Sequence, residues 1–308
     1  MENSQLPTPT SDTKKIASRL SLLLLGVLWG STFVVVSSTK DFFQPAFLIA
    51  LRFSIGFIFL LLFFFRRCML CNAQYVIAGS LVGLTTFFGY YTQAYAMTVL
   101  DGAPGRVAFL VATYCVTVPF MSWLINKKRP SIFNIVAAFM CIVGIGFISL
   151  PDLLAKNSSN VFTDLFALLS SFIFVFHIVL VERIAIRLDT VLFTMSQFFV
   201  VAVCAFCFSF IFENNSMTVW SNTSVFTLLY LAIPCTAIAL VLQTFGQKYT
   251  PASTASLFFA LESVFGMGFS VLFGKEKITI PLVCGGFLIV ASIIVSEIKL
   301  PLKSMRSQ

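Results

Sequence analysis

The chain has 308 residues, of which 58% are hydrophobic and only 10% are charged, and its mean hydropathy is +0.97. A soluble domain carries about 25% charged residues, so this chain cannot cover itself with a water-compatible surface and belongs in a lipid bilayer. Its net charge of +8 comes from Lys and Arg in short loops and tails, without an RNA-binding signature. We therefore expect no nucleic-acid partner.

Ten apolar stretches follow one another along the chain, and each approaches the roughly 20 residues that a helix needs to cross a bilayer. Their apolar character is continuous and does not alternate, which favours helices over strands. We predict an all-α integral membrane protein with ten transmembrane helices. The predicted spans are 20–39, 42–65, 74–97, 107–126, 130–151, 164–181, 190–212, 225–247, 251–273 and 278–297.

The polar segments between and beyond the spans predict orientation. Residues 1–15 are expected to form a disordered cytoplasmic tail, 299–308 a second cytoplasmic tail, and 152–163 an outer linker loop. The first apolar run is too long for a signal-peptide core, so we expect it to be retained as a span. Of the 20 Lys and Arg residues, 14 fall on the side of the N-terminus, and Arg52 and Arg106 lie within or at the edge of spans. The other four, Lys40, Lys156, Lys275 and Lys277, fall on the opposite side. The positive-inside rule then places both termini in the cytoplasm.

A weak internal repeat divides the spans into two groups of five. A shift of about 150 residues aligns Thr86 with Thr236 and Gln93 with Gln243, together with loops and span ends. Residues 16–151 form the first predicted repeat and 164–298 the second. An odd number of spans in each repeat requires the halves to run in opposite directions, and inverted repeats of this kind are typical of transporters.

Three stretches carry a family resemblance: "LLGVLWGSTFVVVS" in the first span, "QPAFLIALRF" in the second and "ALESVFGMGFSVLFGKEK" across the ninth. With these residues the chain resembles the EamA family of the drug/metabolite transporter superfamily. That family typically carries a Trp-Gly pair, an Arg and a Glu-Pro at these places. Here they correspond to Trp29-Gly30, Arg52 and Glu262, although Ser263 stands in place of the Pro.

The resemblance implies transport of a small metabolite by alternating access through a central cavity. We expect the first, third, fourth, sixth, eighth and ninth spans to line it. The resemblance does not imply a particular substrate. The first repeat departs further from the family pattern, because Ala112 and Asn126 stand where acidic or Gly-Glu motifs are expected.

Glu262 is the strongest candidate for a functional residue. It lies near the middle of an apolar span, where a carboxylate costs roughly 2.5–3.5 kcal/mol on insertion scales. Intramembrane acids usually face a cavity or a partner. Glu262 is expected either to meet a substrate amine or carry a proton, or to form a structural ion pair or hydrogen bond.

Two other ionisable residues are embedded in predicted spans. Arg52 lies about 10 Å inside the second span and could attract an anionic group or balance Glu262; snorkelling or a contact to backbone carbonyls is an equal alternative. His177 is the only histidine, and it is either a neutral packing residue or a cavity and proton-relay residue. Arg106 is expected at the outer interface in a topological or loop-closing role.

Aromatic and amide side chains supply further candidates for the cavity: Trp29, Tyr90, Gln93, Tyr114 and Gln243. An aromatic ring can stack on a planar or apolar ligand while its polar atom seeks a partner. Simple hydrogen bonding between helices is the alternative for each residue alone. As a set they predict an amphipathic cavity.

These features predict a transporter of a small organic metabolite, coupled to protons or to a counter-substrate. The embedded acid, arginine and aromatics favour a zwitterionic ligand, such as an amino acid or an amine-bearing nucleoside derivative like S-adenosylmethionine. An intramembrane enzyme and a channel-like facilitator are the alternatives, but no GxSxG, HExxH or paired-carboxylate motif supports an enzyme.

We further expect no cofactor and no metal site, since one histidine without an acid or thiol cluster cannot build a usual zinc site. The expected partners are the metabolite and the lipid bilayer. The expected oligomeric state is a monomer or a homodimer. The expected location is a plasma membrane, specifically a bacterial inner membrane.

Overall fold

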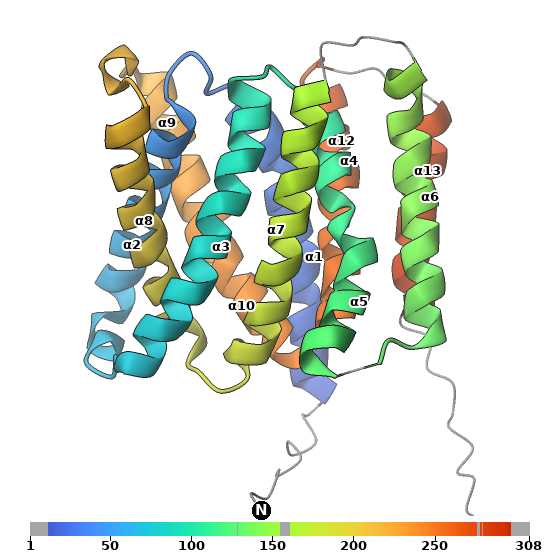
Figure 1. Cartoon of the computed structure of the whole chain (residues 1–308), viewed down its shortest axis with the longest axis horizontal. Helices are drawn as coiled ribbons and strands as arrows, with labels where there is room; N and C mark the ends of the chain where they lie inside the picture. The colour runs from blue at the N-terminus through green and yellow to red at the C-terminus, as the bar shows by residue number, and fades with distance from the viewer. Residues whose placement is uncertain (1–11, 128, 155–160, 276–277, 279, 297–308) are drawn as a thin grey trace, which may run out of the picture.

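The computed structural model describes residues 12–127, 129–154, 161–275, 278 and 280–296, and in these residues all regular secondary structure is helical. The helices lie side by side along one common direction (Figure 1). The first half of the chain forms α1 (Asp12–Ser37), α2 (Pro45–Cys68), α3 (Ala73–Thr98), α4 (Pro104–Ala112), α5 (Tyr114–Asn126) and α6 (Ile132–Leu154). The second half forms α7 (Val161–Ala185), α8 (Thr190–Phe212), η2 (Asn215–Met217), α9 (Asn222–Ala232), η3 (Ile233–Ile238), α10 (Ala239–Tyr249), α11 (Ala252–Phe259), α12 (Leu261–Leu272) and α13 (Ile280–Ser296).

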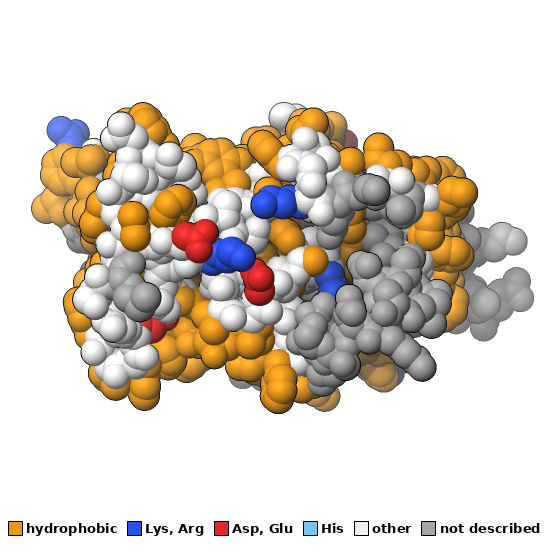
Figure 2. All heavy atoms as spheres, turned by 90° about the horizontal axis from the view of Figure 1, so that it is seen from above, with side chains coloured by type: hydrophobic (Ala, Val, Ile, Leu, Met, Phe, Trp, Pro, Cys, Tyr) orange, Lys and Arg blue, Asp and Glu red, His pale blue; other side chains and the backbone are white. Residues whose placement is uncertain are grey.

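Several helical segments have the length and apolar composition of membrane spans. Among the described residues seven segments qualify, and shorter apolar helices occur at Ile132–Gly144 and Val283–Val295. Viewed from one end of the bundle, hydrophobic side chains lie around its perimeter (Figure 2). This arrangement is that of a multi-pass membrane protein. The seven segments are Asp12–Ser37, Pro45–Cys68, Pro104–Ile125, Phe162–Ala185, Thr190–Phe212, Asn222–Tyr249 and Ala252–Leu272.

The helix boundaries correct two of the predicted polar segments. α1 begins at Asp12, so the predicted tail 1–15 is helical at its end, while 1–11 and the tail 299–308 lie outside the described residues. An acidic first turn favours a helix N-terminus, and the Lys15 ammonium lies 3.4 Å from the Asp12 carboxylate. The predicted loop 152–163 is shorter than expected, because α6 extends to Leu154 and α7 starts at Val161; residues 155–160 are not described.

Two predicted spans are broken near their middles. The segment 104–126 divides at Thr113 into α4 and α5, and 252–272 divides at Ala260 into α11 and α12. The backbone ψ angles of these two residues, −13° and −17°, are less negative than the value of about −42° in an α-helix. The Thr113 hydroxyl donates to the carbonyl of Leu110, and the backbone N–H of Ser263 to that of Ala260. A continuous apolar pattern cannot reveal such a local change from α to 3₁₀-like geometry.

The predicted span 225–247 contains a π-helical segment, η3, between α9 and α10. Pro234 lacks a backbone N–H and cannot continue the α-helical hydrogen-bond pattern. The Thr236 hydroxyl donates to the carbonyl of Leu231 at 2.7 Å, which satisfies a group in the irregular turn. This turn positions the Thr236 oxygen to accept from Arg52.

The two halves of the chain pack against each other in reciprocal pairs. α1 packs on α10 and α12, and α7 packs on α3 and α5. α2 packs on α8, and α6 packs on α13, as Figure 1 also shows for the green and red helices at one side. Each pair joins segments that are far apart in sequence, so the core is built mainly between the halves.

Gly30 permits the close approach of α1 and α12. A Cβ atom at this position would lie 2.5 Å from the Phe265 Cβ and 3.0 Å from the Glu262 carbonyl oxygen. Gly26, one turn earlier, also faces this interface, near Leu261. The GxxxG pattern at 26–30 therefore serves packing inside one chain, on the backbone that carries Glu262.

An ion pair joins the halves where α4 and α7 begin. Charged side chains gather near the centre of the end of the bundle that Figure 2 shows. The Arg106 guanidinium donates to both carboxylate oxygens of Asp164, at 2.8 and 2.5 Å, and both residues are largely buried. Nearby in the loops, the hydrogen bond and negative charge of Asp101 raise the pKa of the Lys40 ammonium. Arg106 thus connects α4 to α7, which is a more specific role than the predicted topological or loop-closing one.

Arg106→Gln is expected to lower the free energy of unfolding by about 2–3 kcal/mol, because the Asp164 carboxylate would stay desolvated without its cation. Arg106→Gln combined with Asp164→Asn should recover part of this loss. Thermal unfolding of the purified protein in detergent measures both. Equal loss in the single and double variants would show that the pair itself is not what stabilises the junction.

Candidate functional site

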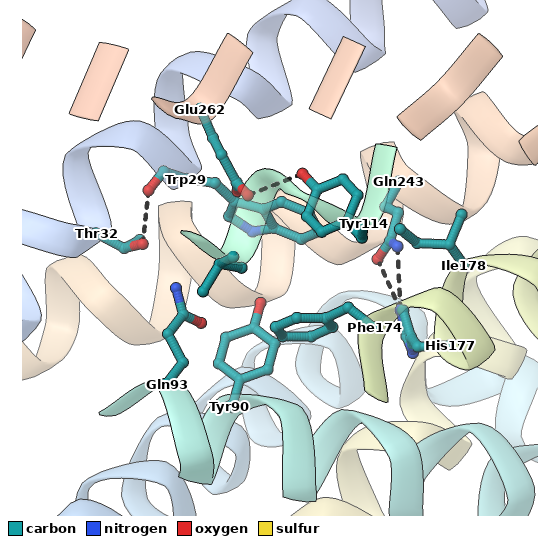
Figure 3. Close-up of a pocket in the computed structure, with 11 residues that line it drawn as sticks. Trp29, Thr32, Tyr90, Gln93, Tyr114, Phe174, His177, Ile178, Gln243 and Glu262 are labelled. Carbon is teal, nitrogen blue, oxygen red and sulfur yellow. Dashed lines mark hydrogen bonds between the residues drawn. The ribbon is translucent and has the colours of Figure 1, made fainter. Parts of the chain in front are cut away.

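A pocket lies in the middle of the bundle, between helices of both halves (Figure 3). Its walls come from α1, α3, α4, α5, α7, α10 and α12, which correspond to the first, third, fourth, sixth, eighth and ninth predicted spans. The side chains that line it are Trp29, Thr32, Tyr90, Gln93, Val111, Tyr114, Phe174, His177, Ile178, Gln243 and Glu262.

Glu262 and Tyr114 form one wall of this pocket. The Tyr114 hydroxyl donates to the Glu262 Oε1 at 2.8 Å, and both side chains are buried. Tyr114 is the first residue of α5 and Glu262 the second of α12, so both follow directly after the two helix breaks. The second carboxylate oxygen of Glu262 has no hydrogen-bond partner among the described residues, which leaves it available to a ligand.

Trp29 and Thr32 are one turn apart on α1 and meet the same pocket. The Thr32 hydroxyl donates to the Trp29 carbonyl at 2.6 Å. The indole ring packs against Phe259 with a centroid separation of 5.6 Å. Its Nε1–H is buried and unpartnered in the described part of the chain. A buried donor without an acceptor is costly, and a ligand oxygen would satisfy it.

Arg52 lies beside the main pocket in a smaller one, of about 10 Å³, which shares Thr32, Tyr90 and Gln93 with it. Its guanidinium donates to Thr236 at 3.0 and 3.2 Å and lies 5.3 Å from the centroid of the Tyr90 ring. No carboxylate of the described residues, Glu262 included, is within ion-pair distance of it. Arg52 and Glu262 therefore do not form a direct ion pair in this conformation.

His177 is held in a hydrogen-bond network at another wall. Because the Thr86 hydroxyl donates to the Val82 carbonyl, its oxygen is free to accept from His177 Nδ1, 3.1 Å away. The Gln243 amide then donates to the His177 Nε2 at 3.0 Å and to the Gln247 side chain at 3.1 Å. These roles describe a neutral histidine with both ring nitrogens satisfied. The geometry favours the packing alternative for His177, which still contributes an edge to the pocket.

Seven of the eight candidate side chains named from the sequence meet in the main pocket, and Arg52 lies in the adjoining one. Thr32, Val111, Phe174 and Ile178 also line the pocket but were not among the candidates. Thr32 could have been found from its spacing, since it follows the candidate Trp29 by three positions on one helix face. The three apolar residues carry no signal that distinguishes them from ordinary core.

No group of three or more His, Cys, Asp or Glu side chains that could hold a metal occurs within the described ranges. The water-accessible volume of the pocket is about 20 Å³. That volume suits roughly one water molecule, since a site needs about 10–15 Å³ for each. The conformation is therefore closed around the pocket, and an organic ligand requires the surrounding helices to move apart.

The fold is that of a multi-pass membrane protein with a closed pocket between its two halves. The sequence profile of the EamA-like transporter family matches the chain twice, over residues 18–150 and 161–297. The chain belongs to the EamA-like transporter family. The resemblance noted from Trp29-Gly30, Arg52 and Glu262 is thereby confirmed.

Two relatives are similar to this chain in sequence, and one solved structure is similar to it in fold. An uncharacterized transporter of Archaeoglobus fulgidus is 26% identical over 286 residues, which are 93% of this chain and 87% of the relative. The uncharacterized transporter YoaV of Bacillus subtilis is 25% identical over 280 residues, 89% of this chain and 94% of the relative. A crystal structure of another protein has the same fold, with a TM-score of 0.71 and 18% identity, over 92% of this chain and 96% of that one. The family and the names of the relatives indicate a membrane transporter.

Proposed function

We propose that this protein moves a small zwitterionic organic metabolite across the membrane by alternating access. Its two five-span halves would be inverted repeats, with the ligand bound between them near the bilayer midplane. The reciprocal packing of α1 on α12 and of α7 on α5 supports this arrangement, because rocking of the halves would open either end of the pocket in turn. The excess of Lys and Arg on the side of the membrane that holds the N-terminus favours an orientation with both termini in the cytoplasm, and we place the protein in a plasma membrane.

One observation carries the proposal of a zwitterion: two embedded ionisable groups lie in adjoining pockets and do not pair with each other. Glu262 faces the main pocket, and Arg52 lines the smaller one. A ligand ammonium would pair with Glu262, and a ligand carboxylate would reach toward Arg52 and the unpartnered Trp29 Nε1–H. Each embedded charge would then be compensated by the ligand, which offsets the cost of its burial.

The same arrangement supports coupling at Glu262. After the substrate leaves, either a proton would neutralise the carboxylate or a second substrate would bind to it before the carrier reorients. Tyr114 would serve as the donor that holds the carboxylate in place through the cycle. Both proton coupling and exchange follow from this one requirement, that a buried charge is not carried through the closed state unpaired.

Counterflow in proteoliposomes tests the proposal. Vesicles preloaded with an unlabelled amino acid or S-adenosylmethionine should accumulate the labelled compound transiently. Analogues that lack either the amine or the carboxylate should exchange at least roughly tenfold more slowly, since each leaves one buried partner unmatched. An enzyme would show no labelled exchange, and a channel would show no acceleration by internal substrate. Equal rates for the zwitterion and its singly charged analogues would contradict the proposed substrate class.

A further inference from the structure

A second hollow lies on the side of the bundle, between the start of α3 and the end of α7. Its volume is about 530 Å³, much larger than that of the central pocket. The side chains that line it are Gln74, Ile77, Ala78, Leu81, Leu180, Arg183, Ile184, Arg187 and Leu188. We call it the α3–α7 groove. None of these residues lines the central pocket, so the groove is separate from the site described above.

Two arginines lie at one end of this groove. Arg183 is in the last turn of α7, and Arg187 follows four residues later, just beyond the end of that helix; both are exposed. No carboxylate of the described residues lies within ion-pair distance of either guanidinium. The acids beside them in sequence have other contacts: the Glu182 carboxylate is buried near the Ser122 hydroxyl, and Asp189 pairs with Arg67. The groove therefore has two guanidinium groups for an anion.

Apart from the two arginines and Gln74, the groove is lined by apolar side chains and opens on the side of the bundle. Ile77 and Leu81, on α3, are 61% and 52% exposed, and Leu180 and Ile184 line it from α7. Beneath them, Ala78 packs in a small separate core with Val82 and Phe193. On each helix two large apolar side chains lie one turn apart, and together these four side chains offer a surface to a hydrocarbon chain.

We propose that the α3–α7 groove is a binding site for an anionic phospholipid. The phosphate lies against Arg183 and Arg187, whose planar guanidinium groups match phosphate oxygens in pairs. One acyl chain lies along the groove, against Ile77, Leu81 and Ile184. The Gln74 amide, at the start of α3, faces the headgroup. Basic pockets between transmembrane helices on one side of a bilayer are the recognised setting for such headgroups.

The position of the groove along the helices supports a lipid as its ligand. α3 begins at Ala73 and α7 ends at Ala185, so the arginines lie at the helix ends, where headgroups are found, and the apolar walls extend inward from there. A free phosphate or a soluble anion would use the two arginines alone. A lipid uses both parts of the groove at once.

Native mass spectrometry of the full-length protein in mild detergent tests this site, with dioleoylphosphatidylglycerol, dioleoylphosphatidylcholine and inorganic phosphate as probes. The phosphatidylglycerol complex should form at concentrations roughly tenfold lower than the phosphatidylcholine complex. Arg183→Gln with Arg187→Gln should weaken phosphatidylglycerol binding by roughly ten- to thirtyfold and abolish this preference. Arg66→Gln with Arg129→Gln removes two exposed arginines at the same end outside the groove, and should leave binding within about twofold of the unaltered protein.

A second variant tests the apolar part of the site and does not alter its charge. Leu81→Trp should fill the groove and weaken phosphatidylglycerol binding, whereas Leu84→Trp, at an exposed position outside the groove, should not. If both double arginine variants lost phosphatidylglycerol binding equally, the proposal would be overturned, because binding would then reflect the overall charge of the protein. Competition by inorganic phosphate together with unaltered binding in Leu81→Trp would overturn it in favour of a free-anion site. The Leu81→Trp comparison decides the question even where the arginine variant does not fold.

Discussion

Glu262→Gln is expected to reduce substrate exchange at least roughly 30-fold, because truncating a buried charged hydrogen-bond partner costs about 2–5 kcal/mol and each 1.4 kcal/mol is a factor of ten. Gln keeps the size of the side chain and an acceptor for the Tyr114 hydroxyl, but it has no charge for a substrate ammonium. Accumulation driven by a pH gradient should disappear together with exchange. The measurement is uptake of labelled substrate into proteoliposomes, with and without internal substrate and across a range of pH.

The stability of Glu262→Gln separates the functional explanation from the structural one. A buried carboxylate without a cation destabilises the fold, so its neutral replacement should unfold at the same temperature or a higher one. If Glu262 only held helices together, the variant should unfold at a lower temperature and still transport. Asp101→Asn is the matched control: it removes a carboxylate from an exposed loop position with φ of 53°, which Asn tolerates. Its exchange rate should stay unchanged.

Gly30→Ala is expected to destabilise the protein by about 1–3 kcal/mol and to slow exchange as well, since a methyl group there has no room between two backbones. The added Cβ would overlap Phe265 and press on the carbonyl of Glu262. α1 and α12 would have to separate, which moves the Glu262 carboxylate relative to Tyr114. Thermal unfolding in detergent and the exchange assay measure the two effects.

Gly268→Ala is the matched control for this substitution, because it changes a glycine on α12 that has open space around its Cβ position. Alanine is the better helix former by about 0.8–1.0 kcal/mol, so this variant should be as stable as the unaltered protein or more so. If Gly30→Ala behaved like Gly268→Ala, the close contact between α1 and α12 would not limit packing. Loss of exchange in both variants would point to a general need for helix flexibility.

The sequence predicted the class of the fold because a bilayer imposes simple demands. Spans must be long, apolar and helical, so composition and the positions of charges were enough to locate them approximately. α8 has the predicted bounds 190–212, whereas α1 begins at Asp12 and not at the predicted residue 20. The interior breaks at Thr113, Ala260 and Pro234 were not predicted as breaks. Apolar side chains suit straight, broken and π-helical segments equally, and proline in a membrane helix often causes only a kink.

Most of the candidate site was found from chemistry alone, since Glu262, His177 and the aromatic or amide residues stand out against an apolar background. For each of these residues the sequence allowed both a functional and a structural role. Only the residues that surround it in the structure distinguish the two roles. Arg52 binds Thr236 because a π-helical turn brings that hydroxyl to it, and His177 is satisfied by Thr86 and Gln243 from two other helices. Contacts between residues 66 to 184 positions apart cannot be read from local spacing.

By itself, the sequence determined that this chain lies in a membrane, which stretches of it are helical and which few residues are costly to bury there. These properties follow from the free energy of transfer of each residue, which is local. Only the tertiary structure decided that Glu262 meets Tyr114 and not Arg52, that Arg106 joins the two halves through Asp164, and that Gly30 brings α1 onto the backbone of α12. Those outcomes depend on how helices from opposite ends of the chain pack, and packing is a property of the whole bundle.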